Sequence, residues 1–478
     1  MSYRTLKTVR KPLAACLLVA LVAPGMAFAD TAKGSTPREQ ALEARVAELE
    51  RQVQLLLGSQ QQQQTQISQT QQAVTEVRTL QAEQKPAVPA GKQSIQITTL
   101  TPGAAAGTTV KIGGFIKADF LGTQTSDGQL ADDATGRALY LPGQTPVAGA
   151  GGTGRRSGTD FNAHAKFSRF NLGIDTVTDA GNKAGGFFEM DFFGNSLGNQ
   201  TATNTYGVTL RHAYMYWNNW LAGQTWSNFM DAASLPEAVD FVGPTDGVIF
   251  VRQAQIRYTQ GGFSVTLENP ETTTLTGTHN PLTGAWTNAS ANSDRGGLPD
   301  LTLRYGWKGS WGTFGVGGLV RQLKVDNQTT GAKADKVAGG LTLGGKWVMG
   351  DSDTLHYQFT GGEGIARYIG LGVTADSAYD IARDELNPTG VLAGYVGWRH
   401  AFTPKLRTNL IYARSDYDND SVLGPLVTKS VQSIRGNIFY SPLPKVDVGA
   451  ELMFGRSEIE NGSKGDITRL QFTTKYSF

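Results

Sequence analysis

"LQFTTKYSF", residues 470–478, is the stretch that decides the fold. Read with a period of two, it places Leu470, Phe472, Thr474, Tyr476 and Phe478 on one face and glutamine, threonine, lysine and serine on the other. Chain ends usually fray in water and consist of polar residues. A final strand with one apolar face therefore requires a sheet beneath it or lipid beside it.

The composition of the whole chain is typical of a protein made of strands. Its 478 residues include 59 glycines, one cysteine and aromatic residues scattered throughout, which indicates many short strands and turns and few helices. After residue 30 no run approaches the roughly 18 apolar residues that a membrane-spanning helix needs. If the chain crosses a bilayer, it crosses as strands.

Residues 1–29 have the pattern of a signal peptide. Four basic residues precede the apolar stretch "LAACLLVALV" at 13–22, and "AFA" at 27–29 is a small-x-small cleavage signal. Acylation of Cys16 is an alternative, but the apolar run continues beyond it. Removing the segment changes the formal net charge from +2 to −2, which gives no support to a nucleic-acid binder. The mature chain has no cysteine for disulfides or thiolate metal sites.

The next segment, residues 30–84, predicts an α-helical coiled coil. From Pro37 onward, apolar residues alternate at spacings of four and three through Leu42, Val46 and Leu49, and the register continues across a glutamine-rich run. A disordered polar tether is the alternative. An isolated helix needs a partner to persist in water, so the coiled coil predicts an oligomer. Residues 85–108, rich in Pro, Gly, Ala and Thr, are a linker.

Residues 109–478 predict an all-β transmembrane barrel of about sixteen antiparallel strands. The predicted strands, read from alternating apolar and polar residues, are 110–122, 165–177, 184–194, 206–218, 220–228, 250–259, 263–268, 299–308, 312–325, 335–349, 353–361, 389–402, 405–416, 430–440, 445–457 and 466–478. Their connections alternate between tight links and long loops, which is how bacterial outer-membrane barrels are built. No motif repeats as in a propeller. With an even strand number, both ends of the barrel and the coiled coil lie on the short-turn, periplasmic side.

The two faces of each predicted strand are then expected to contact different environments. In "DLTLRYGWKG", residues 300–309, Leu301, Leu303, Tyr305 and Trp307 share one face, opposite threonine, arginine and lysine. In a membrane barrel the apolar faces meet lipid and the polar faces surround water, and closure pairs every backbone group. Phe478 then belongs to a periplasmic aromatic girdle in the closing strand.

This phase places a set of basic residues toward the lumen. The inward cations are Lys117, Arg169, Arg257, Arg304, Arg321, Lys346, Arg399, Arg407, Arg435, Arg469 and Lys475, against the inward acids Asp119, Asp175, Glu189, Asp191, Glu268, Asp447 and Glu451. Cations that line a pore raise the local anion concentration and favour anion passage. The alternative for each arginine is that it balances a loop carboxylate across the lumen.

One long loop is the candidate constriction. Residues 227–248 are too many for a turn and too apolar for a free loop, and we expect them to fold into the barrel. Asp231, Glu237 and Asp240, together with Asp246, would then face the basic wall. A second long loop, 123–160, is glycine-rich and is expected at the mouth.

An enzyme is not expected, and neither a cofactor nor a metal. The five histidines show no metal-ligand spacing. A rim hydrolase using His164 or His212 beside Ser168 or Asp191 remains an alternative, because a catalytic triad is recognised by geometry. We therefore assign no catalytic residues from the sequence.

Four segments in the middle of the chain resemble the DcaP-like trimeric porins. They are "LAGQTWSNFMD" (221–231), "LPEAVDF" (235–241), "VRQAQIRYT" (251–259) and "LENPE" (267–271). The resemblance implies a trimer of sixteen-strand barrels that admits small negatively charged solutes, including dicarboxylic and aromatic acids. It makes Arg252 and Arg257 candidate lumen or loop-anchoring residues. Ala254 stands where the family pattern suggests proline.

Together these features predict a passive outer-membrane porin for small anionic solutes such as (di)carboxylates. Its expected partners are two further copies of the chain, outer-membrane lipid and lipopolysaccharide, and the barrel-assembly machinery. Its coiled coil is expected in the periplasm. A barrel that anchors a periplasmic coiled-coil spacer is the alternative, and a rim hydrolase is a more distant one.

Overall fold

A computed structural model describes residues 108–131, 134–194, 206–291, 293, 297–327, 331 and 333–478. The expected signal peptide and coiled coil, and all but the last residue of the expected linker, lie outside the described residues. Among the helices described, none has the length and apolar character to cross a membrane, a finding that does not concern β-barrels.

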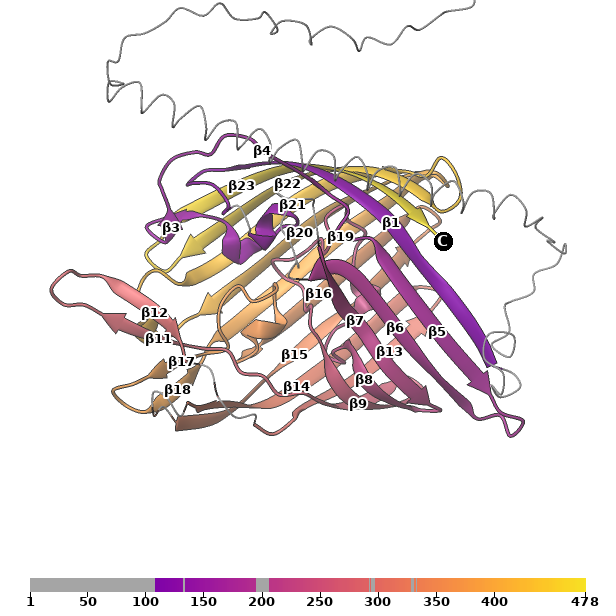
Figure 1. The fold of residues 1–478 in the computed structure, drawn as a ribbon, viewed down its shortest axis with the longest axis horizontal. Coiled ribbons are helices and arrows are strands. Elements are labelled where there is room, and N and C mark those ends of the chain that lie inside the picture. The colour runs from indigo at the N-terminus through magenta and orange to yellow at the C-terminus, as the bar shows by residue number, and fades with distance from the viewer. Residues whose placement is uncertain are drawn as a thin grey trace, which may run out of the picture. The chain divides into compact units, whose positions relative to one another are not determined.

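The described residues form a closed barrel (Figure 1). Its sixteen strand positions are held by β1 (Thr108–Thr125), β5 (Arg169–Val177), β6 (Lys183–Gly194), β7 (Gly207–Trp217), β8 (Trp220–Trp226), β9 (Arg252–Gln260), β10 (Phe263–Glu268), β13 (Asp300–Gly309), β14 (Gly312–Asp326), β15 (Lys333–Met349), β16 (Asp353–Glu363), β19 (Gly390–Thr403), β20 (Leu406–Asp418), β21 (Thr428–Tyr440), β22 (Val446–Ile459) and β23 (Lys464–Ser477). Each pairs with the next in antiparallel fashion, and β4 (Asp160–His164) continues the position of β5, because both pair with β1.

The last strand closes the ring. β23 pairs with β1 in a register that runs from Phe115 opposite Ser477 to Thr125 opposite Ile467. The amide of Phe478 also donates to the carbonyl of Gly114 at 3.1 Å. The barrel therefore leaves no edge strand, which satisfies the demand of lipid for paired backbone groups.

All sixteen predicted strands are confirmed, with small differences at their ends. The range 263–268 matches β10 at both ends. The largest difference is at 165–177, where β5 begins only at Arg169. Residues 165–168 form a turn instead, closed by the amide of Ser168 donating to Ala165.

The outward face is apolar, as the alternation predicts. On β13, Leu303 is 44 % exposed while the neighbouring Thr302 is fully buried inside. Exposed aromatic residues gather near the short turns, and they include Trp217, Trp220, Tyr305, Trp307, Trp347, Trp398, Tyr440, Tyr476 and Phe478. These aromatics match the girdle at one membrane interface. Short turns lie on the periplasmic side of outer-membrane barrels in general, which is the orientation expected for this chain from its sequence.

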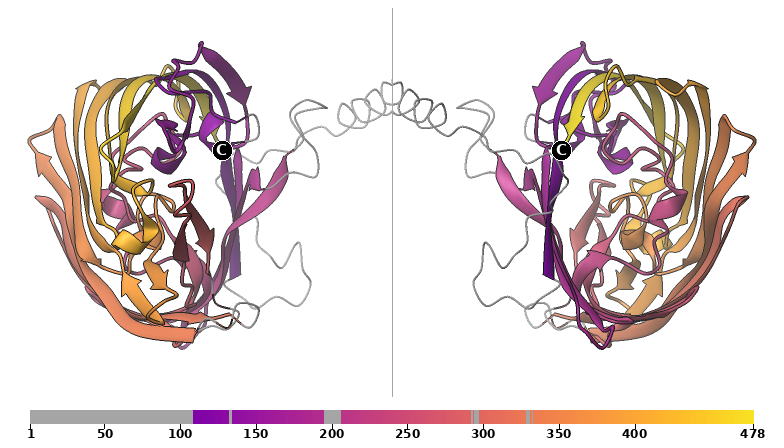
Figure 2. Two further views of the ribbon diagram at one scale, coloured as in Figure 1. Left: turned by 90° about the vertical axis from the view of Figure 1, so that its left-hand side faces the viewer. Right: turned by 90° about the vertical axis from the view of Figure 1, so that its right-hand side faces the viewer.

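Smaller elements lie at the long-loop end. β11 (Thr274–His279), β12 (Trp286–Ser290), β17 (Ser377–Asp380) and β18 (Glu385–Pro388) form a four-stranded sheet there, and β2 (Val147–Ala148) pairs with β3 (Gly151–Gly152). The described residues also contain five short 3-10 helices: η1 (Thr135–Arg137), η2 (Pro142–Gln144), η3 (Ala232–Ser234), η4 (Ala366–Tyr368) and η5 (Ser421–Leu423). Figure 2 shows loop segments inside the ring of strands when it is viewed from either end.

A hydrophobic core lies inside the barrel, where the sequence predicted one apolar loop, residues 227–248, against a polar wall. Phe229, Ile249 and Tyr368 are fully buried in it, and all three belong to long loops. The wall beneath them is apolar too, for example at Leu319 and Tyr395. The inner face therefore departs from the polar pattern of a water-filled barrel where a loop packs on it.

Candidate functional site

The loop between β8 and β9, residues 227–251, crosses the lumen as expected. Its two ends are joined by the amide of Ser227, which donates to the carbonyl of Val251 at 2.9 Å. Further along, the Ser234 hydroxyl bonds that of Tyr395 at 2.7 Å, and the amide of Val239 donates to Glu451 Oε2 at 3.0 Å. Tyr395 and Glu451 lie on β19 and β22, far around the ring from β8 and β9. The loop therefore reaches from one wall to another.

A second loop, residues 364–389 between β16 and β19, joins the first inside the barrel. Ile249 and Ile369 form an antiparallel bridge between them. The amide of Phe250 donates to Tyr368 at 3.0 Å, and the amide of Gly370 donates to Val248 at 3.0 Å. Only the first of these loops was expected to fold inward, because the sequence pattern gives no sign that the two loops pair.

The loop that follows β1 also enters the lumen and contacts the first loop. The amide of Tyr140 donates to Asp240 Oδ2 at 2.9 Å, and its hydroxyl donates to Asp246 Oδ1 at 2.7 Å. The hydroxyl of Ser433 on β21 donates to the other oxygen of Asp246. Burial raises the pKa of Asp246 to about 6 in spite of these donors. Three loops, not one, therefore contact each other inside the barrel.

The acids of the crossing loop face basic residues of the wall. Asp231 lies 2.8 Å from Arg304, and Glu237 lies 2.6 Å from Arg407 and 3.8 Å from Arg399.

Asp240 continues the same arrangement with a looser pair. It lies 3.9 Å from the buried Arg435, which also approaches Glu451 at 3.5 Å. For Arg304, Arg399, Arg407 and Arg435 the structure therefore shows the arrangement in which wall cations balance loop carboxylates.

Arg321 performs the same kind of anchoring for the second loop. Its guanidinium lies 3.3 Å from Asp300 on the neighbouring strand and 3.1 Å from Asp376 of the loop. Its Nη1 also donates to the carbonyl of Gly364 at 2.9 Å. Arg321 is only 2 % exposed, so it is enclosed by the loop and does not face open lumen.

Four of the expected cations form no ion pair with any described residue: Arg252, Arg257, Lys346 and Arg469. Arg252 stacks on Trp226, with its guanidinium carbon 4.5 Å from the ring centre, and on Phe250 at 5.7 Å. Arg257 donates to the carbonyl of Trp226 and to Gln255, both at 2.6 Å.

Arg469 differs from the other three because it is buried. It donates to Thr123 at 2.9 Å and to the carbonyl of Gly136 at 2.5 Å, which ties the loop after β1 to the closing strand. Arg252, Arg257 and Lys346 are partly exposed. These three are the expected lumen cations that form no ion pair with a described residue and keep access to solvent.

One inward cation was missed by the sequence analysis. Arg211 on β7 donates to Glu189 at 2.8 Å and to Asp191 at 2.8 Å, and Arg169 lies 3.5 Å from Glu189. A bulge shifts the register beside it, since Glu189 is opposite His212 but Met190 is opposite Leu210. The extra residue turns Arg211 inward, and a strict period of two gives no signal for it.

The residues named for a rim hydrolase do not come together. His164 Nε2 contacts the carbonyl of Ala138 at 3.0 Å, and Ser168 donates to the carbonyl of Lys117 at 3.2 Å. His212 Nδ1 contacts the hydroxyl of Thr225 at 3.0 Å. Within the described ranges no group of three His, Cys, Asp or Glu residues is arranged to hold a metal ion.

A closed sixteen-strand barrel with inward loops and an apolar exterior defines the class of outer-membrane porins. Comparison with known proteins specifies the family. The family model described as DcaP outer membrane protein matches residues 29–478, and the chain belongs to this family of outer-membrane channels, not to an enzyme family. Among curated protein sequences none matches this chain.

Solved structures agree with this assignment. The outer membrane channel DcaP of Acinetobacter baumannii is 25 % identical, with a TM-score of 0.61 over 78 % of this chain and 99 % of that one. An anion-selective porin from Comamonas acidovorans is 12 % identical over 78 % and 100 % of the two chains, with a TM-score of 0.46. OmpT of Vibrio cholerae is 11 % identical over 78 % and 99 %, with a TM-score of 0.45. The last two similarities are too weak to bear on function.

Proposed function

We propose that this outer-membrane channel passes small anionic solutes such as (di)carboxylates by passive diffusion. The observation that supports the proposal is the charge left in the lumen after the loops have been anchored. Arg252, Arg257 and Lys346 are partly exposed and form no ion pair with a described residue. A pore with unpaired cations concentrates anions and repels cations.

The position of the cations extends this argument along the pore. Arg257 and Lys346 lie nearer to the short turns of their strands than to the long loops. Arg399 and Arg407 lie at the same level, but Glu237 balances their charge. An anion that has passed the crossing loops therefore meets a basic exit on the periplasmic side. The guanidinium groups there suit carboxylates, because their planar donors match the two carboxylate oxygens.

Ion selectivity in a planar bilayer tests the proposal. Under a KCl gradient we expect the wild type to favour chloride and the double variant Arg252→Gln, Arg257→Gln to lower the anion-to-cation permeability ratio by about twofold or more. Arg383→Gln is the matched control, because Arg383 is a highly exposed loop arginine that pairs with Asp380 at 3.0 Å. A cation-selective wild type would show the proposal to be wrong. A non-conducting barrel would favour the alternative role as an anchor for a periplasmic spacer.

We also propose three features of the assembled protein. The chain is exported by its signal peptide, inserts into the outer membrane with the barrel-assembly machinery reading the strand that ends at Phe478, and forms a homotrimer whose coiled coil lies in the periplasm. The heptad pattern from Pro37 supports the oligomer. Deleting residues 37–84 tests it: we expect the trimer to dissociate at a lower temperature in detergent, and unchanged heat resistance would contradict a role for this segment.

A further inference from the structure

Arg252, the first residue of β9, has a free edge of hydrogen-bond donors. Arg257 and Arg469 donate to neighbouring carbonyls, whereas Arg252 donates to no described residue. Of its guanidinium nitrogens only Nη1 is enclosed, and the Nε and Nη2 groups keep access to solvent. These two groups point the same way, and they form the edge with which an arginine donates to both oxygens of a carboxylate.

Two aromatic rings hold the guanidinium of Arg252 in place. Its central carbon lies 4.5 Å from the ring centre of Trp226 and 5.7 Å from that of Phe250. The two rings meet edge to face, with their centres 4.7 Å apart. Phe250 is itself fixed, because its amide donates to the carbonyl of Tyr368 in the second loop. A contact of a cation with aromatic rings needs no acceptor, so the donor edge is oriented before a solute arrives.

The charged groups around Arg252 leave one positive charge unbalanced. The charges that act on it most strongly are those of Arg211, Asp191, Arg169 and Glu189. Arg211 donates to both acids at 2.8 Å, and Arg169 lies 3.5 Å from Glu189. Three cations therefore share two carboxylates, and the two acids are already paired with the other two arginines. The excess charge lies on Arg252, and one monovalent anion would balance the group.

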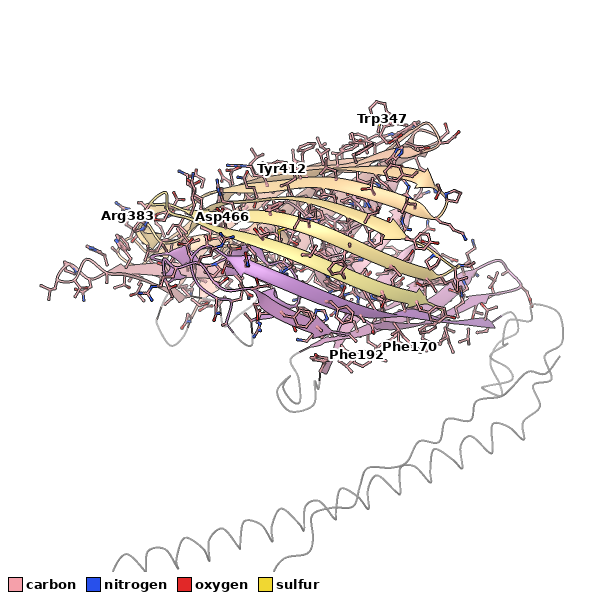
Figure 3. The ribbon with its side chains drawn as sticks, turned by 90° about the horizontal axis from the view of Figure 1, so that it is seen from above. Phe170, Phe192, Trp347, Arg383, Tyr412 and Asp466 are labelled. Atoms are coloured by element: carbon pink, nitrogen blue, oxygen red, sulfur yellow. The ribbon has the colours of Figure 1, made fainter. Side chains whose placement is uncertain are left out.

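This group of charges lies inside the barrel, at the base of the crossing loop. Figure 3 labels Phe170 and Phe192, which follow Arg169 and Asp191 along β5 and β6 and point away from the barrel. The charged neighbours of these phenylalanines therefore face inward. The crossing loop leaves β8 and rejoins the wall at β9, where the last residue of β8 pairs with Arg252. A solute that passes this loop meets the excess charge.

We propose that Arg252 forms a carboxylate-binding subsite of the pore, in which its Nε and Nη2 groups donate to both oxygens of one carboxylate group of a passing solute. The inference rests on the proposed anion passage and adds to it a saturable site with a preferred anion shape. A planar, monovalent carboxylate matches one donor edge and one excess charge. Inorganic phosphate averages more than one charge at neutral pH, and its further oxygens find no donors at this edge. Trp226 is a positioning residue, because its ring acts on the solute only through Arg252.

The concentration dependence of the current in a planar bilayer tests the subsite. The full chain is recorded in potassium acetate and in potassium phosphate, and we expect the current to reach half-saturation at a lower concentration of acetate than of phosphate. Arg252→Lys keeps the charge but replaces the donor edge by a point charge. We expect it to raise the half-saturation concentration of acetate by about tenfold and to leave the anion-to-cation permeability ratio in KCl unchanged.

Lys346→Gln is the matched control, because it removes another partly exposed lumen cation that has no ion pair with a described residue. We expect it to lower the permeability ratio and to preserve the preference for acetate over phosphate. Trp226→Leu removes the ring and no charge, so we expect it to weaken this preference by about threefold, and Trp226→Tyr should restore most of it. A heat-dependent gel shift confirms that each variant is folded.

Three results would overturn the subsite. They are an acetate current that does not saturate in the wild type, equal half-saturation by acetate and phosphate, and a half-saturation concentration that Arg252→Lys leaves unchanged. If the wild type still favours chloride over potassium in KCl, any of them leaves the proposed anion passage intact. A cation-selective wild type would contradict the anion passage and the subsite together.

Discussion

Two groups of arginines line the inner face of this barrel, and they differ in whether a loop carboxylate pairs with them. Arg304, Arg321 and Arg407 are paired with carboxylates of inward loops, whereas Arg252 and Arg257 have no such partner among the described residues. The comparison shows that two arginines on the inner face of the barrel can have different roles, although they share residue type and orientation. A wall cation opposite a loop acid anchors the loop, and in the proposed function a wall cation without such a partner supplies charge to the pore.

The largest expected effect comes from breaking a loop anchor. Arg321→Ala leaves Asp300 and Asp376 buried without their cation, so we expect a loss of about 3–5 kcal/mol in the free energy of unfolding. Urea-dependent loss of the folded band on gels measures it. Arg414→Ala, which breaks the partly exposed pair with Asp416 on the outer face, should cost about 1 kcal/mol or less. An equal loss in the free energy of unfolding for the two variants would show that the buried loop anchor contributes no more than an exposed ion pair.

An intermediate effect concerns pH and the buried acid of the crossing loop. The pKa of Asp246 is about 6 in the folded state, above the usual value of an aspartate, so folding takes up a proton. Its charge lowers the stability at neutral pH, and this cost disappears as the pH falls through about 6 toward 4. We expect the wild type to gain on the order of 2 kcal/mol over Asp246→Asn between pH 7 and pH 4.5. Parallel pH profiles of the two proteins would contradict a raised pKa.

The smallest expected effect is on ion selectivity, and it tests the comparison by converting a paired arginine into an unpaired one. Glu237→Gln removes the acid that pairs with Arg399 and one of the two acids that pair with Arg407, which keeps Asp447 at 3.1 Å. Arg399 therefore moves from the paired group to the unpaired group. We expect a higher anion-to-cation permeability ratio in a planar bilayer, by about twofold. Glu458→Gln is the control, because Glu458 lies on the barrel exterior, paired with Lys464 at 3.3 Å. A lower ratio would mean that the freed arginine leaves the pore or that the loop has moved.

The strands were predictable because lipid imposes one rule on every one of them. The alternation at Leu303 or Phe472 is visible in the sequence, since each outward position within the hydrocarbon layer must be apolar whatever its neighbours are. The bulge beside Arg211 is the kind of detail that the rule misses, because a single extra residue reverses the faces locally.

The loops obey no such periodic rule, and so they were only partly predicted. The apolar character of residues 227–248 indicated that this loop folds inward, and its acids Asp231 and Glu237 do meet wall arginines. The pairing of Ile249 with Ile369 was not visible, since it joins segments more than a hundred residues apart through backbone groups that every residue carries. For the same reason the burial of Arg321 could not be read from its place on a strand.

The sequence by itself determined a closed barrel of sixteen strands with lipid outside and basic residues inside, because a period of two in each strand suffices to separate the two faces. Only the tertiary structure decided which of those basic residues remain available to a solute. That choice depends on where loop carboxylates come to rest in the lumen, and contacts between distant segments set this position, not any local pattern.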